Sequence, residues 1–246
     1  MEVAIVGDIQ KADAIALIAK YLGSLPKRTE GFDALDKLRT IKRANGPFAM
    51  SVELKSATPK ALVTAGFIGC DERDPLRRPL GLASLILSDQ MIQQIRIRDQ
   101  LVYSIRCQLS PARSIPGTGT LVASAPTDPK NTGKLADAIA GIIKKFATDG
   151  PTPDELATAK KQIANQLVSQ MPEPGFWVTL LGDMNYRGRP LKEIKELPGI
   201  FQTYTADQIR DAVRKCVTDD RAIRLEVIPQ EASVQAVLPD TRPSLH

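Results

Sequence analysis

Histidine is almost absent from this chain of 246 residues, because the only one, His246, is the last residue. A hydrolytic zinc site needs three protein ligands, usually including histidines, in addition to a water molecule. A Ser-His or Cys-His nucleophile pair also needs a histidine as its base. The chain alone therefore lacks the zinc-binding and general-base residues of a hydrolase, and we expect no metal or other cofactor in it.

The carboxylates do not replace the missing histidines. None of the more prominent ones forms a recognisable catalytic pair; these are Glu53, Asp71, Asp89, Asp99 and Glu155. We interpret them as solvated side chains or helix caps. Cysteine is scarce as well, since Cys70, Cys107 and Cys216 are far apart and no Cys-x-x-Cys pair occurs. This spacing argues against a disulfide scaffold or a zinc knuckle and favours buried thiols that pack as small hydrophobic groups.

The chain also lacks long hydrophobic runs. No apolar run approaches the roughly 18 residues of a membrane span. The start has neither the basic region nor the cleavage site of a signal peptide and goes straight into a strand pattern, which is typical of an excised domain or of one subunit of a pair. The sequence carries no targeting signal, and both the bacterial periplasm and the cytoplasm fit it.

Aromatic residues make up only 4% of the chain, although its net charge is +5. The basic residues are dispersed, often as pairs such as Lys27-Arg28 and Lys160-Lys161, and no aromatic residues interleave with them. A nucleic-acid surface would concentrate both kinds of residue in one stripe. We therefore expect no nucleic-acid partner and place the basic pairs on solvated helix faces.

Short strand and helix patterns fill the rest of the sequence. Apolar residues alternate with small or polar ones over residues 48–55, which predicts a half-buried strand. Further strands are predicted over residues 3–6, 61–68, 102–109, 120–125 and 223–227. The strand over 102–109 would carry on one face Tyr103, Ile105, Cys107 and Leu109.

Helical spacing predicts helices between these strands, at residues 15–22, 82–95, 135–146 and 176–186. Two more helices begin with capping boxes, formed by Thr152 with Glu155 and by Thr205 with Gln208. Hairpins separated by helices indicate an α+β fold, with an antiparallel or mixed sheet and helices packed on one of its faces. We predict a single domain over residues 1–229, a connector within it over 27–47, and a tail over 230–246.

One stretch has two possible meanings. Arg96 and Arg98 follow an apolar helix pattern, and Tyr103 stands at the start of a strand pattern. In structural terms, the arginines complement the dipole at a helix C-terminus, and tyrosine is a good strand former. Spacing alone favours this structural interpretation.

The wider context adds a resemblance. The run from Leu85 to Ser104 resembles the C-terminal half of the pitrilysin/insulinase family of zinc metallopeptidases, the inverzincins, of the bacterial zinc-protease-like type. In that half a helix ends in an apolar residue and Arg-Glu; two variable residues follow, then Gly-Leu, one more residue and Tyr-Ser. Ile95-Arg96, Leu101 and Tyr103-Ser104 match this pattern.

Two positions depart from the family pattern: Ile97 stands where glutamate is usual, and Gln100 where glycine is usual. The second departure would displace the turn before Tyr103. The similarity nevertheless covers residues 3 to 229 in the family's order, since it includes the opening strand, the helix start at residues 150–161, the capping box at residue 205 and the closing strand.

The resemblance implies a processing-peptidase-like fold and a division of labour. The family carries its zinc in the other half, on an inverted His-x-x-Glu-His helix, and the two halves enclose an extended peptide. This chain would be the metal-free half that positions the substrate, and its partners would be a zinc-bearing N-terminal half or subunit and a peptide. Arg96 would hold a peptide carbonyl, with Arg98 as its rival, and Tyr103 would stabilise the transition state.

Two alternatives remain at this point. Some relatives keep the fold but are inactive structural or core subunits, and the departures at Ile97 and Gln100 fit such a subunit. The other alternative is an unrelated α+β binding domain with a different strand order. The first interpretation, a substrate-positioning half, makes the chain part of a zinc metalloendopeptidase without being a complete enzyme itself.

Overall fold

The computed structural model describes residues 3–26, 46–56, 58–182, 184–185, 188 and 190–230. Its elements, in chain order, are α1 (Lys11–Tyr21), β1 (Phe48–Lys55), β2 (Ala61–Ile68), α3 (Arg77–Met91), η1 (Ile92–Arg98), β3 (Arg106–Ser110), β4 (Thr120–Thr127), η2 (Pro129–Asn131), α4 (Thr132–Asp149), α5 (Pro153–Gln170), α6 (Pro174–Leu181), α7 (Leu191–Lys195), α8 (Leu197–Gln202), α9 (Ala206–Arg214), η3 (Asp219–Arg221) and β5 (Ala222–Gln230).

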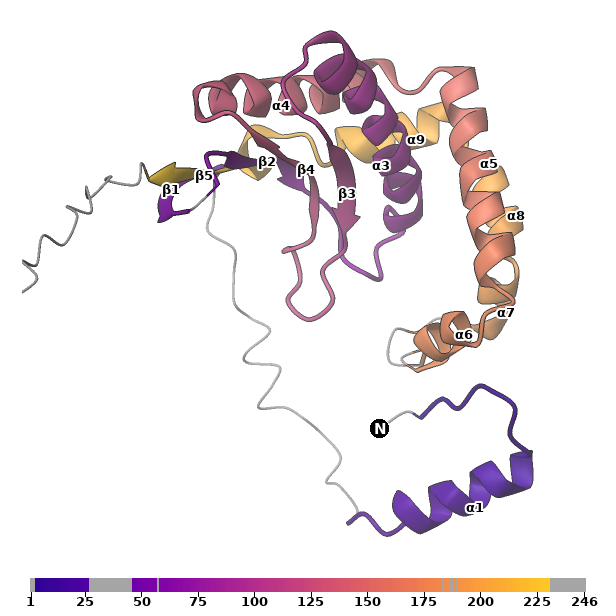
Figure 1. The fold of residues 1–246 in the computed structure, drawn as a ribbon. Helices are drawn as coiled ribbons and strands as arrows, with labels where there is room; N and C mark the ends of the chain where they lie inside the picture. Colours follow the sequence, from indigo (N-terminus) through magenta and orange to yellow (C-terminus); the bar gives the residue numbers. More distant parts are fainter. Residues whose placement is uncertain are drawn as a thin grey trace, which may run out of the picture.

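Five of these elements form one mixed sheet with the strand order β1-β5-β2-β4-β3. The β1–β5 pair is parallel, and the other neighbours are antiparallel. Helices α3, α4 and α9 lie together on one side of the sheet (Figure 1). The predicted α+β fold, with a mixed sheet and helices on one face, is therefore confirmed.

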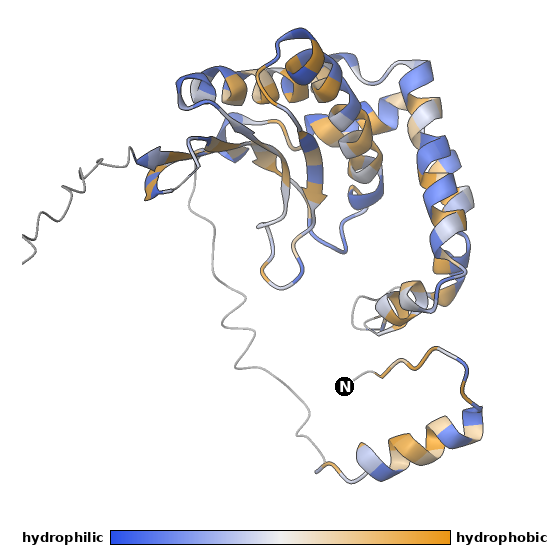
Figure 2. Cartoon of the chain, viewed as in Figure 1, coloured by the Kyte–Doolittle hydropathy of each residue, from blue (hydrophilic) through white to orange (hydrophobic). Residues whose placement is uncertain are grey.

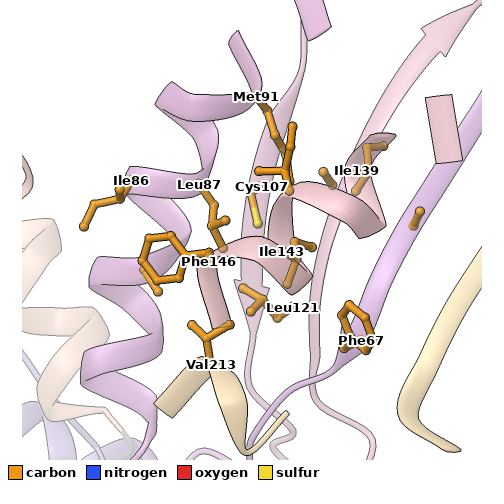
Figure 3. Packing of buried hydrophobic residues seen from close by; sticks show 14 of the residues in the cluster. Phe67, Ile86, Leu87, Met91, Cys107, Leu121, Ile139, Ile143, Phe146 and Val213 are labelled. Atoms are coloured by element: carbon orange, nitrogen blue, oxygen red, sulfur yellow. The ribbon is translucent and has the colours of Figure 1, made fainter. Parts of the chain in front are cut away.

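The core lies between that face of the sheet and the three helices. On β2, Val63 and Phe67 are buried and face the same side as their β4 partners Ala125 and Leu121. Figure 3 shows the helical contribution to this core, which comes from Leu87 and Met91 of α3, Ile139 and Ile143 of α4, and Val213 of α9. Side chains from alternate positions of the strands and from one face of each helix thus form a single hydrophobic cluster.

Both predicted capping boxes are present. The Thr152 hydroxyl accepts the Glu155 N–H, and the Glu155 carboxylate accepts the Thr152 N–H at 2.8 Å. Thr205 and Gln208 make the same reciprocal pair at the start of α9. Each box satisfies backbone donors that a helix start leaves without partners inside the helix.

The three cysteines are free and buried, as predicted. Burial raises the pKa of Cys107 to about 12, and burial followed by the charge of Asp74 raises the pKa of Cys70 to about 12. These thiols are therefore protonated at neutral pH and serve as packing groups. In the part of the chain that the structure describes, no helix is both long enough and apolar enough to cross a bilayer.

Three predictions at the ends and edge of the fold were wrong. Residues 3–6 form no strand, and Val3 and Ile5 are each 48% exposed. Strand β1 is exposed along nearly its whole length, not half-buried, because it is the sheet's edge strand and α3, α4 and α9 pack on other strands. The helix predicted to reach residue 186 ends as α6 at Leu181.

Two further predictions fall largely outside the described residues. Most of the connector predicted over 27–47 lies there, as does the tail predicted over 230–246, apart from Gln230, which ends β5.

Candidate functional site

The candidate site begins where α3 changes into η1, a π-helical turn over Ile92–Arg98. The wider turn is closed by the Asp99 N–H, which donates to the Gln94 carbonyl at 3.0 Å. Ile95 is fully buried, and Arg96 beside it is exposed. Short π-helical turns are rare and are frequently found at functional sites.

The next turn depends on Gln100, whose φ of 52° lies in the left-handed region. Among the described residues it is the only non-glycine with a positive φ. Leu101 N–H donates to the Ile95 carbonyl at 3.0 Å and closes the turn. The glutamine therefore adopts a conformation that glycine accepts freely, at a steric cost of roughly 1–2 kcal/mol. The departure from the family pattern thus lies at a position of local backbone strain.

Buried anchors flank the exposed tyrosine on both sides. Leu101 and Val102 are 8% exposed, and the Thr127 hydroxyl at the end of β4 donates to the Leu101 carbonyl at 2.8 Å. Ile105 is buried on the other side. Tyr103, between these anchors, lies in a bend and is 85% exposed.

The predicted strand over 102–109 was therefore wrong at its start. Strand β3 begins at Arg106, and Tyr103 does not share the buried face of Ile105 and Cys107. The physical reason is that the segment before Arg106 bonds to the helix end and to Thr127 instead of joining the sheet ladder. This difference exposes the phenol that the alternating pattern would have buried.

Ser88 of α3 holds β3 in position, a role that no sequence pattern predicts. The Ser88 hydroxyl accepts the Cys107 N–H and donates to the Cys107 carbonyl, each at 3.0 Å, and it also contacts the Ser84 carbonyl at 2.8 Å. Strand β3 is at the edge of the sheet. The hydroxyl thus takes the place of a neighbouring strand at Cys107 and ties β3, the strand that follows Tyr103, to α3.

Arg96 and Tyr103 are brought together. The guanidinium carbon of Arg96 lies 5.5 Å from the centre of the Tyr103 ring, within the range of a cation–π interaction. Arg98 is committed elsewhere, because it donates to both carboxylate oxygens of Asp99, at 2.8 and 3.2 Å. The hydrogen bond from Arg98 holds the pKa of Asp99 below its ordinary value. Of the two rival arginines, Arg96 is the one that lies beside the phenol.

The pair lies on an open surface. Neither residue lines the hollow of about 200 Å³ between η1 and α4, nor the polar hollow of about 520 Å³ around Arg77, Arg78 and Glu193. Within the described ranges, no three His, Cys, Asp or Glu side chains are grouped so as to hold a metal ion. The arrangement can therefore donate hydrogen bonds to a ligand, but a second surface would be needed to enclose that ligand.

Comparison with known proteins gives the family. The model of the peptidase M16 inactive domain matches residues 1–163. The chain is 25% identical over 201 residues to the chloroplastic stromal processing peptidase of Pisum sativum, a match that covers 78% of this chain and 15% of that protein.

Solved structures show the same fold. A peptidase M16 inactive domain from Pseudomonas fluorescens is similar with a TM-score of 0.74 and 21% identity, over 92% of this chain and 53% of that one. The inactive peptidase domain of a proposed zinc protease from Bordetella parapertussis has a TM-score of 0.62 and 16% identity, over 75% of this chain and 99% of that one. The chain thus spans about half of the Pseudomonas structure and a small part of the pea protein. It belongs to the family of peptidase M16 inactive domains, as the resemblance at Ile95–Ser104 implied.

Proposed function

We propose that this chain is the substrate-positioning half of a two-part zinc metalloendopeptidase, whose zinc lies in the other half. The observation that carries the proposal is the pairing of an exposed phenol with an exposed guanidinium between buried flanking residues. Tyr103 and Arg96 would meet the peptide, and the remainder of the domain would hold them in place.

Tyr103 and Arg96 would each act as a hydrogen-bond donor to the peptide. The metal of the other half would polarise the scissile carbonyl. Tyr103 would donate its O–H to the carbonyl oxygen as negative charge develops there, and Arg96 would donate to a neighbouring peptide carbonyl. Both side chains carry hydrogen-bond donors at neutral pH. One well-placed donor to such an oxygen typically contributes about 10²–10³ in turnover.

The surrounding contacts support this role, because they fix the backbone and leave the two polar groups available. Buried Leu101 and Ile105 hold the bend, whereas Tyr103 is 85% exposed. The cation–π contact restrains both side chains, which lowers the entropy that substrate binding would otherwise cost. Arg98 is less suited to bind a peptide carbonyl, since its guanidinium already donates hydrogen bonds to Asp99.

The test is reconstitution. The isolated chain, the isolated zinc-bearing half and an equimolar mixture are each incubated with an internally quenched peptide. We expect cleavage only in the mixture and its loss after chelation with EDTA. Zinc measured by atomic absorption should be found with the other half alone. No cleavage with a zinc-loaded half that binds this chain would contradict the proposal and would favour an inactive structural subunit.

A further inference from the structure

Strand β3, which follows the candidate site, has two faces of different character. Cys107 and Leu109 point towards the helices, since Cys107 is buried and Leu109 packs against the core. Successive side chains of a strand point to opposite faces, so Arg106 and Gln108 point to the face that α3, α4 and α9 leave open. Both residues are exposed, and Figure 2 shows the start of β3 as hydrophilic (blue). The candidate site therefore continues into an exposed polar strand face.

The side chains around Arg106 on this face carry no charge. Ser124 on β4 is its register partner, and Thr64 on β2 is the partner of Ser124 in turn. The hydroxyls of Ser124 and Thr64 bond to each other at 2.7 Å. On either side of Ser124 the same face of β4 carries Val122 and Pro126. The described strands beside Arg106 thus offer its guanidinium no carboxylate on this face.

The guanidinium of Arg106 is available for a ligand. Within the part of the chain that the structure describes, it forms no ion pair, whereas Arg98 is held by Asp99 at 2.8 Å and Arg224 by Asp137 at 2.9 Å. A guanidinium presents parallel N–H donors that match the two oxygens of a carboxylate. The missing partner is therefore best supplied by a carboxylate of another molecule.

Arg106 lies close enough to the candidate site to contact the same peptide. It follows Tyr103 by three positions, so their Cα atoms are at most about 10 Å apart. Ile105 between them is buried, and the bonds from Ser88 to Cys107 hold the next residue against α3. An extended peptide advances about 3.3 Å per residue. The long side chain of Arg106 can thus reach peptide residues within about three positions of the bond beside Tyr103.

We propose that Arg106 is a specificity-determining residue that binds an acidic side chain, aspartate or glutamate, near the scissile bond. The inference rests on the proposed function, because it requires a peptide held at Arg96 and Tyr103. The peptide carboxylate accepts two N–H donors of the guanidinium on the open face of β3. An ion pair that is fully exposed to water contributes little, but the zinc-bearing half covers the pair and thereby strengthens it. The assembled enzyme therefore prefers acidic peptides.

Matched peptides test this preference in the reconstituted enzyme. An internally quenched peptide with glutamine at the three positions on each side of its cleavage site is compared with variants that carry one glutamate at one of these positions. At one position we expect glutamate to raise kcat/KM about tenfold, because a hydrogen-bonded charge discriminates by at least this factor when enclosed. The gain should lie in KM, since the carboxylate binds equally in the ground state and the transition state.

Two substitutions of Arg106 separate recognition from a structural role. Arg106→Gln should abolish the difference between the glutamate and glutamine peptides. Arg106→Glu should reverse the preference, so that lysine becomes the favoured residue at the same position. Arg113→Gln is the matched control, because it removes the same charge from the exposed loop after β3 and should keep the preference.

A binding measurement tests the same preference without catalysis. Fluorescence anisotropy is recorded for labelled glutamate and glutamine peptides with the mixture of the two halves after EDTA has removed the zinc. We expect a Kd about tenfold lower for the glutamate peptide, and no difference between the two peptides in Arg106→Gln.

Equal kcat/KM values for all the peptides would overturn the proposal and leave the proposed function standing, because cleavage would still occur. Arg106 would then serve only as a charge that keeps the edge strand from pairing with other chains. A preference that persists in Arg106→Gln, or that disappears in Arg113→Gln, would also overturn it. A mixture that neither cleaves nor binds any of the peptides would contradict the proposed function itself, and the role of Arg106 with it.

Discussion

Arg96 and Tyr103 contact each other across a turn, with the guanidinium carbon 5.5 Å from the centre of the phenol ring. The two side chains project from a π-turn and from a bend whose flanking residues are buried. Their relative position therefore follows from how the backbone of residues 95–105 is held.

The strain at Gln100 predicts that Gln100→Gly stabilises the protein. Glycine accepts the φ of 52° freely, which recovers roughly 1–2 kcal/mol of steric cost, and part of this gain is offset by about 0.5–1 kcal/mol of added freedom in the unfolded chain. We expect a net gain of about 0.5–1 kcal/mol in urea unfolding. Gln93→Gly, in the helical part of η1, should instead cost about 1 kcal/mol. A loss of stability in Gln100→Gly would contradict the strain.

The bridge from Ser88 to β3 predicts a large effect from a small deletion. Ser88→Ala leaves the N–H and the carbonyl of buried Cys107 without their partner, which should cost about 1–3 kcal/mol in thermal or urea unfolding. Ser84→Ala is the control, because that hydroxyl donates only to the Gly81 carbonyl of its own helix. Equal losses in the two variants would show that Ser88 does not bridge α3 and β3.

The two arginines should differ in the reconstituted enzyme. Arg96→Ala removes a charged donor beside Tyr103, and because hydrogen bonds to charged groups are worth about 1.5–3 kcal/mol, KM should rise about tenfold or more. Arg98→Ala mainly removes the contact with Asp99 and should change KM less than threefold. A larger rise in Arg98→Ala than in Arg96→Ala would reverse the assignment.

The capping box of α5 predicts an acid-sensitive contribution to stability. Burial of Glu155 would raise its pKa, but hydrogen bonds from the Thr152 N–H, the Gln90 amide and the Thr152 hydroxyl outweigh this and hold the pKa below the ordinary 4.5. A depressed folded pKa means that the contribution is present above pH 4.5 and is lost as the pH falls through the lowered value. Unfolding of Glu155→Gln between pH 7 and 3 should therefore show a shallower loss of stability than the unaltered chain. Identical slopes would contradict this.

Local patterns predicted the local features well. Thr152 and Thr205 were identified as caps because a capping box needs only residues within one turn. The nearly continuous apolar run over 61–68 predicted the position of β2, and the helical stripe over 135–146 predicted α4. The family and the inactive half followed from the motif Ile95–Ser104 in its place along the chain.

Non-local pairing was the main source of error. The alternation in β1 carries no information that the strand lies at the sheet edge beside β5, far away in sequence. Tyr103 fits a strand pattern, yet the hydrogen bond from Thr127, 24 positions later, holds the chain out of the ladder. No sequence pattern distinguishes Ser88 from the other serines, because its role depends on its contact with Cys107 in the folded chain. These contacts are decided by tertiary structure, which overrides local propensity.

The most direct test of the account is Tyr103→Phe in the reconstituted enzyme. The substitution keeps the aromatic ring that Arg96 contacts and removes only the hydroxyl. The account predicts that kcat falls about 10²–10³-fold, with KM changed less than threefold and zinc binding by the other half unchanged. An unchanged kcat in a folded, associated Tyr103→Phe enzyme would contradict the role of this chain as the half that completes the site.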